Sequence, residues 1–340
     1  MPRSDPTGTS DLHTLVNDVL SVAVHPAAGG SIYSIRQVRD DSEVLGRVPW
    51  AWGTPPEGLT RAHDEAEWLR WYGGGWHSLL PSAGDASTHR GRSHGFHGES
   101  ALRAWTLQES STRHAVMAVS LCSMRIEVRR TVRLLGDTIE VVEELRSTDE
   151  EPVDIMWCQH AIFGSQLLEG DVVVESSAQQ TISHEEAEVL ATWGDASHAL
   201  LSPAAPLGIR PVEGEASLRY IPRVREPWVA IRRLDAPLGV ALSWDRSTFP
   251  SVWIWTELRG STEEPWSGAT TMMGIEPSTS WPAVGIGRVV ERGGSVLRLL
   301  PASPLVTTLR LHVFEPTGAV IGVDTHGRAR CEPAERNRDE

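Results

Sequence analysis

Lysine is absent from the 340-residue chain, so arginine and histidine are its only basic side chains. This absence excludes catalysis through a lysine Schiff base and a phosphate-binding loop that needs a lysine. The three cysteines, Cys122, Cys158 and Cys331, are too few for a disulfide framework and fit a reducing compartment. No apolar run reaches the roughly 20 residues that cross a bilayer, and residues 1–15 lack the apolar stretch of a signal peptide. We therefore expect a cytoplasmic protein without a membrane partner.

Positive charge is also scarce, since the formal net charge is −14. An acidic chain matches a phosphate backbone poorly, so nucleic acid is not expected as a partner. Tryptophan is abundant by contrast, with 14 residues against 4 Phe and 3 Tyr. Tryptophan combines a large apolar face with one N–H donor, so most of these residues should pack in a core. Some could instead line a site for ligands with flat apolar patches, such as sugar rings.

Helical periodicity is rare, and only residues 64–72 indicate a short helix. Residues 114–147 predict three strands, with a turn at Gly136–Asp137 between the second and third. Further strand-like runs cover 153–164, 171–177, 238–245, 251–258, 295–300 and 307–315. Many short strands between turn signals predict an all-β sandwich or barrel. We expect a flexible segment at 1–18, one domain at 19–318 and a loose tail at 319–340.

The hexapeptide HGFHGE, His94–Glu99, is the first stretch that could carry chemistry. A metal site needs three or four ligands at fixed geometry, and His94 and His97 lie too close together in sequence for a regular ligand pattern. We therefore expect no metal. Histidines that donate hydrogen bonds to a ligand, and solvated loop histidines, are the two remaining interpretations.

Two later stretches are the other candidates, WCQHAIFG and GIEP. Strand alternation puts Cys158 and His160 on one face, with Gln159 on the other. A Cys–His nucleophile pair is one hypothesis, although no elbow motif accompanies it, and a buried apolar cysteine is the alternative. A histidine in this apolar run must find partners or face a cavity. Glu276 follows an apolar run, where a carboxylate is costly unless paired or functional; an edge-strand glutamate is the alternative.

Taken in this order, HGFHGE, HAIFG and GIEP resemble the aldose 1-epimerase (galactose mutarotase-like) family, over roughly residues 20–315. The resemblance implies a large antiparallel β-sandwich with a sugar-binding groove across one sheet, and a cofactor-independent isomerase with a small-molecule carbohydrate as partner. It implies that Glu276 is the general base and His160 the general acid in ring opening. The first histidine motif would contact sugar hydroxyls, through His94 or His97. We expect a monomer or a homodimer.

One departure leaves the sugar open, because the family's arginine in a Gly-Arg motif before the histidine segment has no counterpart here. The further candidates for substrate binding are Trp76, Gln159, Trp253 and Trp255, of which the last two share a strand face. Three other functions remain open. They are a non-catalytic carbohydrate-binding sandwich, a Cys158–His160 hydrolase, and a sugar-phosphate epimerase whose arginine cluster could come from Arg61, Arg70, Arg90 and Arg92.

Overall fold

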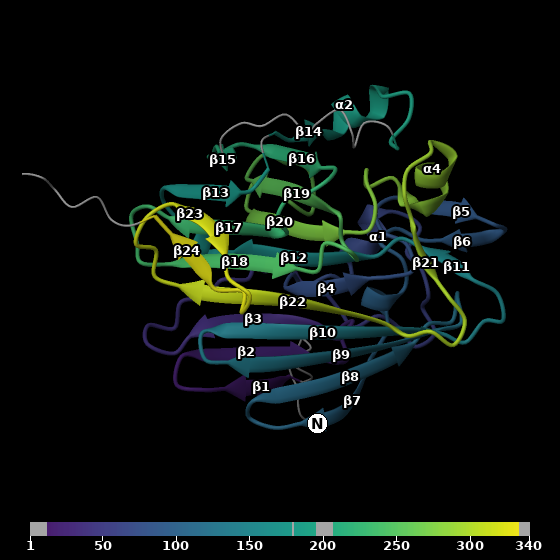
Figure 1. Ribbon diagram of the computed structural model, residues 1–340, viewed down its shortest axis with the longest axis horizontal. Coiled ribbons are helices and arrows are strands. Elements are labelled where there is room, and N and C mark those ends of the chain that lie inside the picture. The colour runs from purple at the N-terminus through teal and green to yellow at the C-terminus, as the bar shows by residue number, and fades with distance from the viewer. Residues whose placement is uncertain (1–11, 179, 195–206, 333–340) are drawn as a thin grey trace, which may run out of the picture.

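The computed structural model describes residues 12–178, 180–194 and 207–332. Within these ranges two nine-stranded antiparallel sheets lie face to face (Figure 1). The first sheet has, in spatial order, the strands β1 (His13–Val16), β2 (Leu20–His25), β3 (Ser31–Gln37), β4 (Trp76–Leu79), β12 (Cys158–Gly164), β20 (Thr271–Ser278), β19 (Ser251–Leu258), β16 (Ala216–Ile221) and β14 (Ile182–Ser183). The second sheet has β15 (Leu207–Ile209), β13 (Val172–Ser176), β17 (Trp228–Arg233), β18 (Gly239–Trp244), β22 (Leu305–Phe314), β10 (Thr138–Ser147), β9 (Ile126–Leu135), β8 (His114–Ser120) and β7 (Thr106–Ser110).

Short elements surround the two sheets. Three two-stranded sheets are β5 (Ser87–His89) with β6 (Arg92–His94), β11 (Val153–Ile155) with β21 (Leu297–Leu299), and β23 (Val320–Val323) with β24 (Ala329–Cys331). The α-helices are α1 (Glu65–Leu69), α2 (His184–Val189) and α4 (Gly285–Glu291), and the 3₁₀ helices are η2 (Ser100–Leu102) and η3 (Ser165–Leu168). No helix in the described ranges is both long and apolar enough to span a bilayer.

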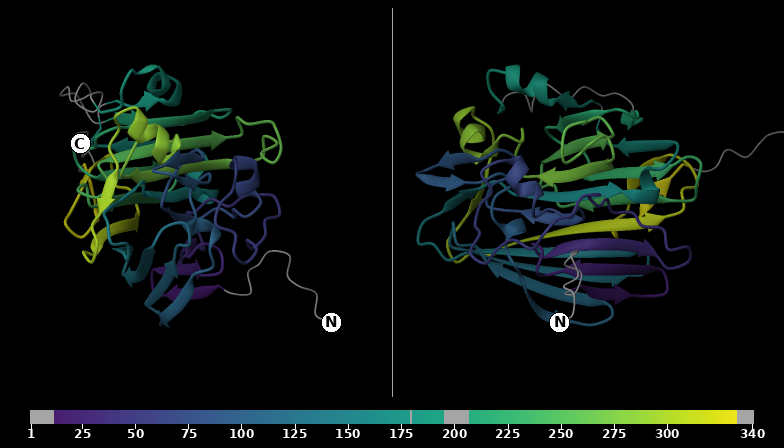
Figure 2. Two further views of the ribbon diagram at one scale, coloured as in Figure 1. Left: turned by 90° about the vertical axis from the view of Figure 1, so that its right-hand side faces the viewer. Right: turned by 180° about the vertical axis from the view of Figure 1, so that it is seen from behind.

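Side-chain alternation gives the first sheet an inner face, against the second sheet, and an outer face. In β19, Val252 and Ile254 belong to the large core between the sheets, whereas Trp253 and Trp255 point outward. Figure 2 (right) shows the molecule from behind, the side on which the first sheet lies. The outer face of this sheet carries the candidate site.

Helix α1 and its flanking loops cover part of this outer face. Asp64 caps the helix by accepting a hydrogen bond from a backbone N–H in the first turn. Trp68 of α1 and the nearby Tyr72 then pack with Ile162 of β12 and Met272 of β20 in a separate apolar cluster. A small cavity therefore lies between the sheet and the loops that cover it.

The all-β architecture predicted from the sequence is confirmed. Residues 114–147 form β8, β9 and β10, the run 251–258 is β19, and the helix expected at 64–72 is α1. The run 153–164 divides into β11 and β12, because the backbone N–H groups of Met156 and Trp157 bond to Pro81 and Thr279 outside the strand ladders.

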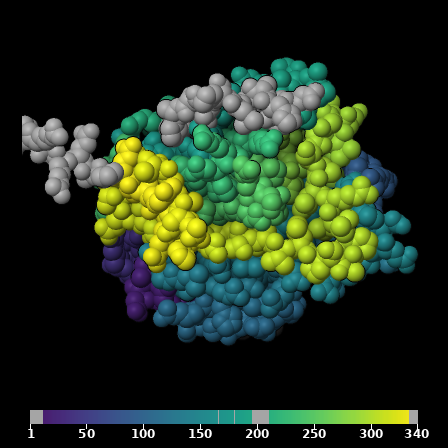
Figure 3. All heavy atoms as spheres, in the orientation of Figure 1, coloured from purple at the N-terminus to yellow at the C-terminus, as the bar shows by residue number. Residues whose placement is uncertain are grey.

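The structure corrects two expected domain boundaries. Strand β1 pairs with β2 and fully buries Leu15, so the fold begins before residue 19. Beyond residue 318, the hairpin β23–β24 packs on β13 and β17 and buries Val320 (yellow in Figure 3). The runs HTLV and VIGV are too short to stand out as strands in the sequence. Residues 1–11 and 333–340, which fall under the same expectations, lie outside the described residues.

A fully buried ion pair of the second sheet lies between the two sheets. Arg130 of β9 donates to the Glu143 carboxylate of β10 at 2.6 Å, and neither side chain is exposed. Arg130 also donates to Gln159 Oε1 at 3.2 Å, and the Gln159 amide donates to Glu143. Ser78 Oγ bonds Glu143 at 3.2 Å. These bonds satisfy charges that burial alone would make costly, and they link the second sheet to β4 and β12.

Candidate functional site

Five neighbouring strands place one row of side chains on the outer face of the first sheet. Cross-strand pairing sets His77 of β4 opposite His160 of β12. The register of β12 with β20 sets His160 across from Glu276. Trp253 of β19 is opposite Glu276, and Tyr220 of β16 is opposite Trp253. The row therefore brings together residues from widely separated parts of the sequence.

His160 and Glu276 lie side by side at the floor of the cavity. His160 Nε2 is 3.9 Å from Glu276 Oε1. Glu276 is 3% exposed and His160 6%, and both line the cavity. Gly274, on the same face of β20, leaves room for this carboxylate, because an added Cβ there would lie 2.2 Å from Oε1. The pair is thus held near a space that a ligand can enter.

Burial sets the protonation of this pair. Loss of water raises the pKa of Glu276 to about 8, which the hydrogen bond from Cys158 offsets in part. Loss of water also lowers the pKa of His160 to about 3. Near pH 7 the pair therefore holds one proton, on the carboxyl group. Two titratable groups whose pKa values are pushed apart in one cavity suit proton transfer.

His97 approaches the same cavity from the HGFHGE loop. Its backbone has a positive φ of 57°, a conformation that non-glycine residues rarely adopt. Gly84 N–H donates to His97 Nδ1 at 3.1 Å, and His97 N–H donates back to Gly84 O at 2.9 Å. Because Nδ1 accepts, the neutral ring carries its proton on Nε2, and burial lowers the His97 pKa so that the ring stays neutral. The His97 ring centroid is 5.2 Å from that of His160.

Aromatic rings form the walls. Trp68 stacks on Tyr72 with centroids 4.2 Å apart, and lies edge-on to His160 at 5.6 Å. Trp255 and Trp266 stand on another side, with centroids 5.6 Å apart. The cavity has a volume of about 360 Å³, which is within the range that holds a small ligand.

Cys158 shares a strand face with His160, as alternation predicts, but its environment does not suit a nucleophile. The side chain is fully buried, and Sγ is 3.7 Å from Glu276 Oε2. Burial, followed by the Glu276 charge, raises the pKa of this thiol well above its usual value. The reactive form of cysteine is the thiolate, so this position favours an inert donor to Glu276.

Trp76 and Gln159, two of the expected sugar contacts, lie on the other side of the sheet. Both are fully buried between the two sheets, where Trp76 Nε1 donates to Gln159 Oε1 at 2.9 Å. They alternate with His77 and His160, so a side chain at either position points away from the cavity. Neither residue belongs to the candidate site.

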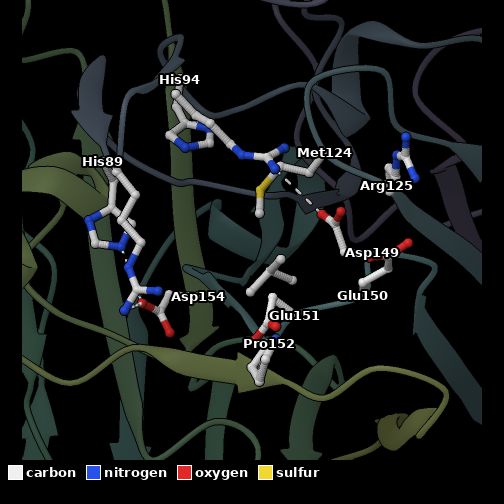
Figure 4. Close-up of a pocket in the computed structure, with 12 residues that line it drawn as sticks. His89, His94, Met124, Arg125, Asp149, Glu150, Glu151, Pro152 and Asp154 are labelled. Carbon is white, nitrogen blue, oxygen red and sulfur yellow. Dashed lines mark hydrogen bonds and ion pairs between the residues drawn. The ribbon is translucent and has the colours of Figure 1, made fainter.

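His94 lies in a different hollow from His97 (Figure 4). That hollow lies between the β5–β6 hairpin and the loop before β11, and Arg90 and Arg92 line it as well. Arg90 is 2.9 Å from Asp154, and Arg92 is 3.5 Å from Asp149. Of the two histidines proposed to contact sugar, only His97 therefore lines the cavity with His160 and Glu276.

The structure adds site residues that no motif indicated. Trp68, Tyr72 and Trp266 come from the covering helix and loops, and Glu65, Asp85 and Glu263 lie at the cavity rim. A helical signal with adjacent aromatics at 64–72 was visible, but its position over the sheet was not. Among the described residues, no three His, Cys, Asp or Glu side chains are arranged to hold a metal ion.

No family model matches the chain, and neither does any curated protein. Solved structures do resemble it. A galactose mutarotase related enzyme from Lactobacillus acidophilus has a TM-score of 0.60 at 15% identity, over 89% of this chain and 97% of that one. A candidate aldose 1-epimerase from Escherichia coli K12 has a TM-score of 0.63 at 15% identity, over 89% of this chain and 99% of that one. A galactose mutarotase-like protein from Lactobacillus casei has a TM-score of 0.60 at 12% identity, over 89% of this chain and 99% of that one. The fold is that of the galactose mutarotase-like β-sandwiches.

Proposed function

We propose that the protein is a cofactor-independent aldose 1-epimerase that interconverts the α and β anomers of a sugar. The observation that supports it most is the buried His160–Glu276 pair, 3.9 Å apart at the floor of a cavity with aromatic walls. The likeness of the fold to proteins named mutarotases and aldose 1-epimerases agrees with this proposal.

Anomer exchange needs two proton transfers at neighbouring oxygens. A base removes the proton from the O1 hydroxyl while the C1–O5 bond breaks, its electron pair going to O5. An acid gives O5 a proton, which leaves an open-chain aldehyde. Rotation about C1–C2 and closure in the reverse sense then give the other anomer. Because O1 and O5 are both bonded to C1, two adjacent protein groups on one wall can serve both oxygens.

We assign the base to Glu276 and the acid to His160. These roles require an ionised Glu276 and a protonated His160. This form holds the same single proton as the neutral pair that burial favours. A hydroxyl that donates to Glu276 stabilises the carboxylate and so favours the transfer of that proton to His160. After ring opening the proton from O1 is on Glu276, and ring closure reverses both transfers. His97 Nε2–H, together with the tryptophan faces, would orient the ring.

The direct test follows the optical rotation of freshly dissolved α-glucose and α-galactose. We expect the wild-type protein to accelerate the approach to equilibrium rotation for at least one aldose, in proportion to protein concentration. The reason is that positioned acid and base groups contribute roughly 10²–10⁴-fold to such proton transfers. Protein denatured by heat serves as the control. A wild-type protein that accelerates no aldose would leave a non-catalytic sugar-binding module as the better reading.

The same pair predicts the pH dependence of the reaction. Catalysis needs one proton on the pair, and the pair loses that proton as the pH rises through the pKa of Glu276, about 8. We therefore expect kcat/KM to be level near neutral pH and to fall above about pH 8. Initial rates of polarimetric change between pH 6 and 10, after subtraction of the uncatalysed rate, measure this. Activity that keeps rising through pH 9 would contradict the pair as the proton carrier.

A further inference from the structure

The candidate cavity has an unusual charge balance. Besides Glu276, its lining includes four carboxylates and no arginine among the described residues, and the chain contains no lysine. Three histidines line the cavity: burial holds His97 and His160 in their neutral form, and His184 forms a hydrogen bond through Nδ1 with the Tyr220 hydroxyl. Formal charge around the cavity is therefore predominantly negative.

Three of these carboxylates lie at the rim and come from separate segments. Glu65 begins α1, Asp85 follows β4, and Glu263 follows β19. Burial and then the charges of Asp85 and Glu263 raise the pKa of Glu65, so both carboxylates lie near enough to act on it. In the described ranges none of these side chains forms a hydrogen bond or an ion pair with another residue.

Glu257, another lining carboxylate, differs from these three because it accepts hydrogen bonds from neighbouring residues. It accepts from Gly260 N–H at 2.8 Å and from Ser261 N–H at 3.1 Å, so its own loop satisfies it. The three rim carboxylates accept no such hydrogen bonds from other residues, and the charges of His184 and Arg288 oppose the rise in the Asp85 pKa that burial causes.

Buried polar atoms at the cavity floor point independently to a ligand. Tyr72 is 3% exposed, and its hydroxyl has no partner among the described residues. His160 Nδ1 is likewise without a partner. Unpartnered buried polar groups are rare in native structures, and a bound polar molecule would satisfy them. The walls are the faces and edges of Trp68, Trp255 and Trp266, and aromatic faces attract cations.

We propose that the cavity takes an aldose that carries a protonated amino group at the end remote from C1, in preference to a neutral or a phosphorylated aldose. This inference rests on the proposed function, because it places C1 at the His160–Glu276 floor. The ammonium group then lies among the rim carboxylates and beside the tryptophans. A phosphate in the same place would meet only negative charge and no arginine fork.

A series of glucose derivatives that differ only in charge at position 6 tests this. The probes are 6-amino-6-deoxyglucose, glucose and glucose 6-phosphate, at a pH where the amine is protonated. We expect kcat/KM to fall in that order, with the amino sugar ahead of glucose by about tenfold, from ion pairing and cation–π contact. Raised salt should reduce the difference. Equal values for the amino sugar and glucose, or a preference for the phosphate, would overturn the proposal.

Variants of the rim carboxylates test whether these residues cause the preference for the amino sugar. Glu65→Gln combined with Glu263→Gln should bring kcat/KM for the amino sugar close to that for glucose. Glu264→Gln is the matched control, because this exposed neighbour of Glu263 does not line the cavity. A preference that survives in the double variant would rule out the rim as its source.

A binding measurement separates this inference from the proposed function. Quenching of tryptophan fluorescence gives the affinity for each probe without any turnover. Tighter binding of the amino sugar supports the charge preference even if no sugar is turned over, whereas the absence of turnover by itself defeats the epimerase proposal. Turnover of glucose with no charge preference in binding or rate defeats only the further inference.

Discussion

Replacement of Glu276 by glutamine should remove nearly all anomerase activity, lowering kcat by roughly 10²–10⁴-fold, while sugar binding survives. Glutamine keeps the shape and the hydrogen-bonding reach of the side chain but cannot take the O1 proton. The backbone of β20 should not change, because Glu276 is held by its place in the strand and by the open space above Gly274. Polarimetry measures the rate, and tryptophan fluorescence measures binding of the same sugar.

Two neighbouring variants sharpen this result. His160→Ala should also be severe, since it removes the other proton carrier. Cys158→Ala should be mild, because the thiol only donates to Glu276 and takes no part in ring opening. If Cys158→Ala alone abolished a measured activity, a cysteine hydrolase would replace the epimerase. A Glu276→Gln protein with wild-type rates would remove the carboxylate from the mechanism.

Replacement of Arg130 by methionine should lower the free energy of unfolding by about 3–5 kcal/mol. The change leaves the Glu143 carboxylate buried between the sheets without its counter-charge, and Gln159 loses one donor. Removing one partner of a buried pair is costly because the remaining charge cannot reach water. Urea unfolding followed by tryptophan fluorescence measures the loss.

The same two strands supply the control. Arg133 and Glu140 form a cross-strand pair at 3.2 Å on the solvent side of β9 and β10, and Arg133→Met should cost less than about 1 kcal/mol. A double variant, Arg130→Met with Glu143→Leu, should regain part of the loss, because no unpaired charge remains. Equal losses of unfolding free energy for Arg130→Met and Arg133→Met would show that the buried pair contributes no more to stability than the exposed pair.

Local sequence pattern was sufficient for much of the fold. The run SVWIWTEL matches β19 residue for residue, because β-branched and aromatic residues alternate between two environments there. The same alternation separates residues of the cavity face from residues of the core face. Gln159 is out of phase with His160, so it could not share a sugar with that histidine. Arg130 and Glu143 stand in phase with inward-facing apolar neighbours, a signal for a buried pair.

The site was predictable only in part. The order of the three motifs indicated His160 and Glu276, but only the pairing of β12 with β20 brings the two side chains together. The choice between His94 and His97 depended on a loop conformation with a positive φ, which no periodicity encodes. The rim carboxylates Glu65, Asp85 and Glu263 come from loops whose convergence is purely tertiary.

The pairing of β12 with β20 has a consequence for the order in which the molecule folds. Cys158 and Glu276 are 118 positions apart in sequence, so their strands can meet only after a long loop has closed. Closure of such loops costs chain entropy before any contact compensates it, and topologies rich in distant contacts fold slowly. Hairpins such as β9–β10 join residues only a turn apart and can form early. The His160–Glu276 pair therefore assembles late, on a scaffold whose local hairpins already exist, and every species that precedes the β12–β20 pairing lacks this pair.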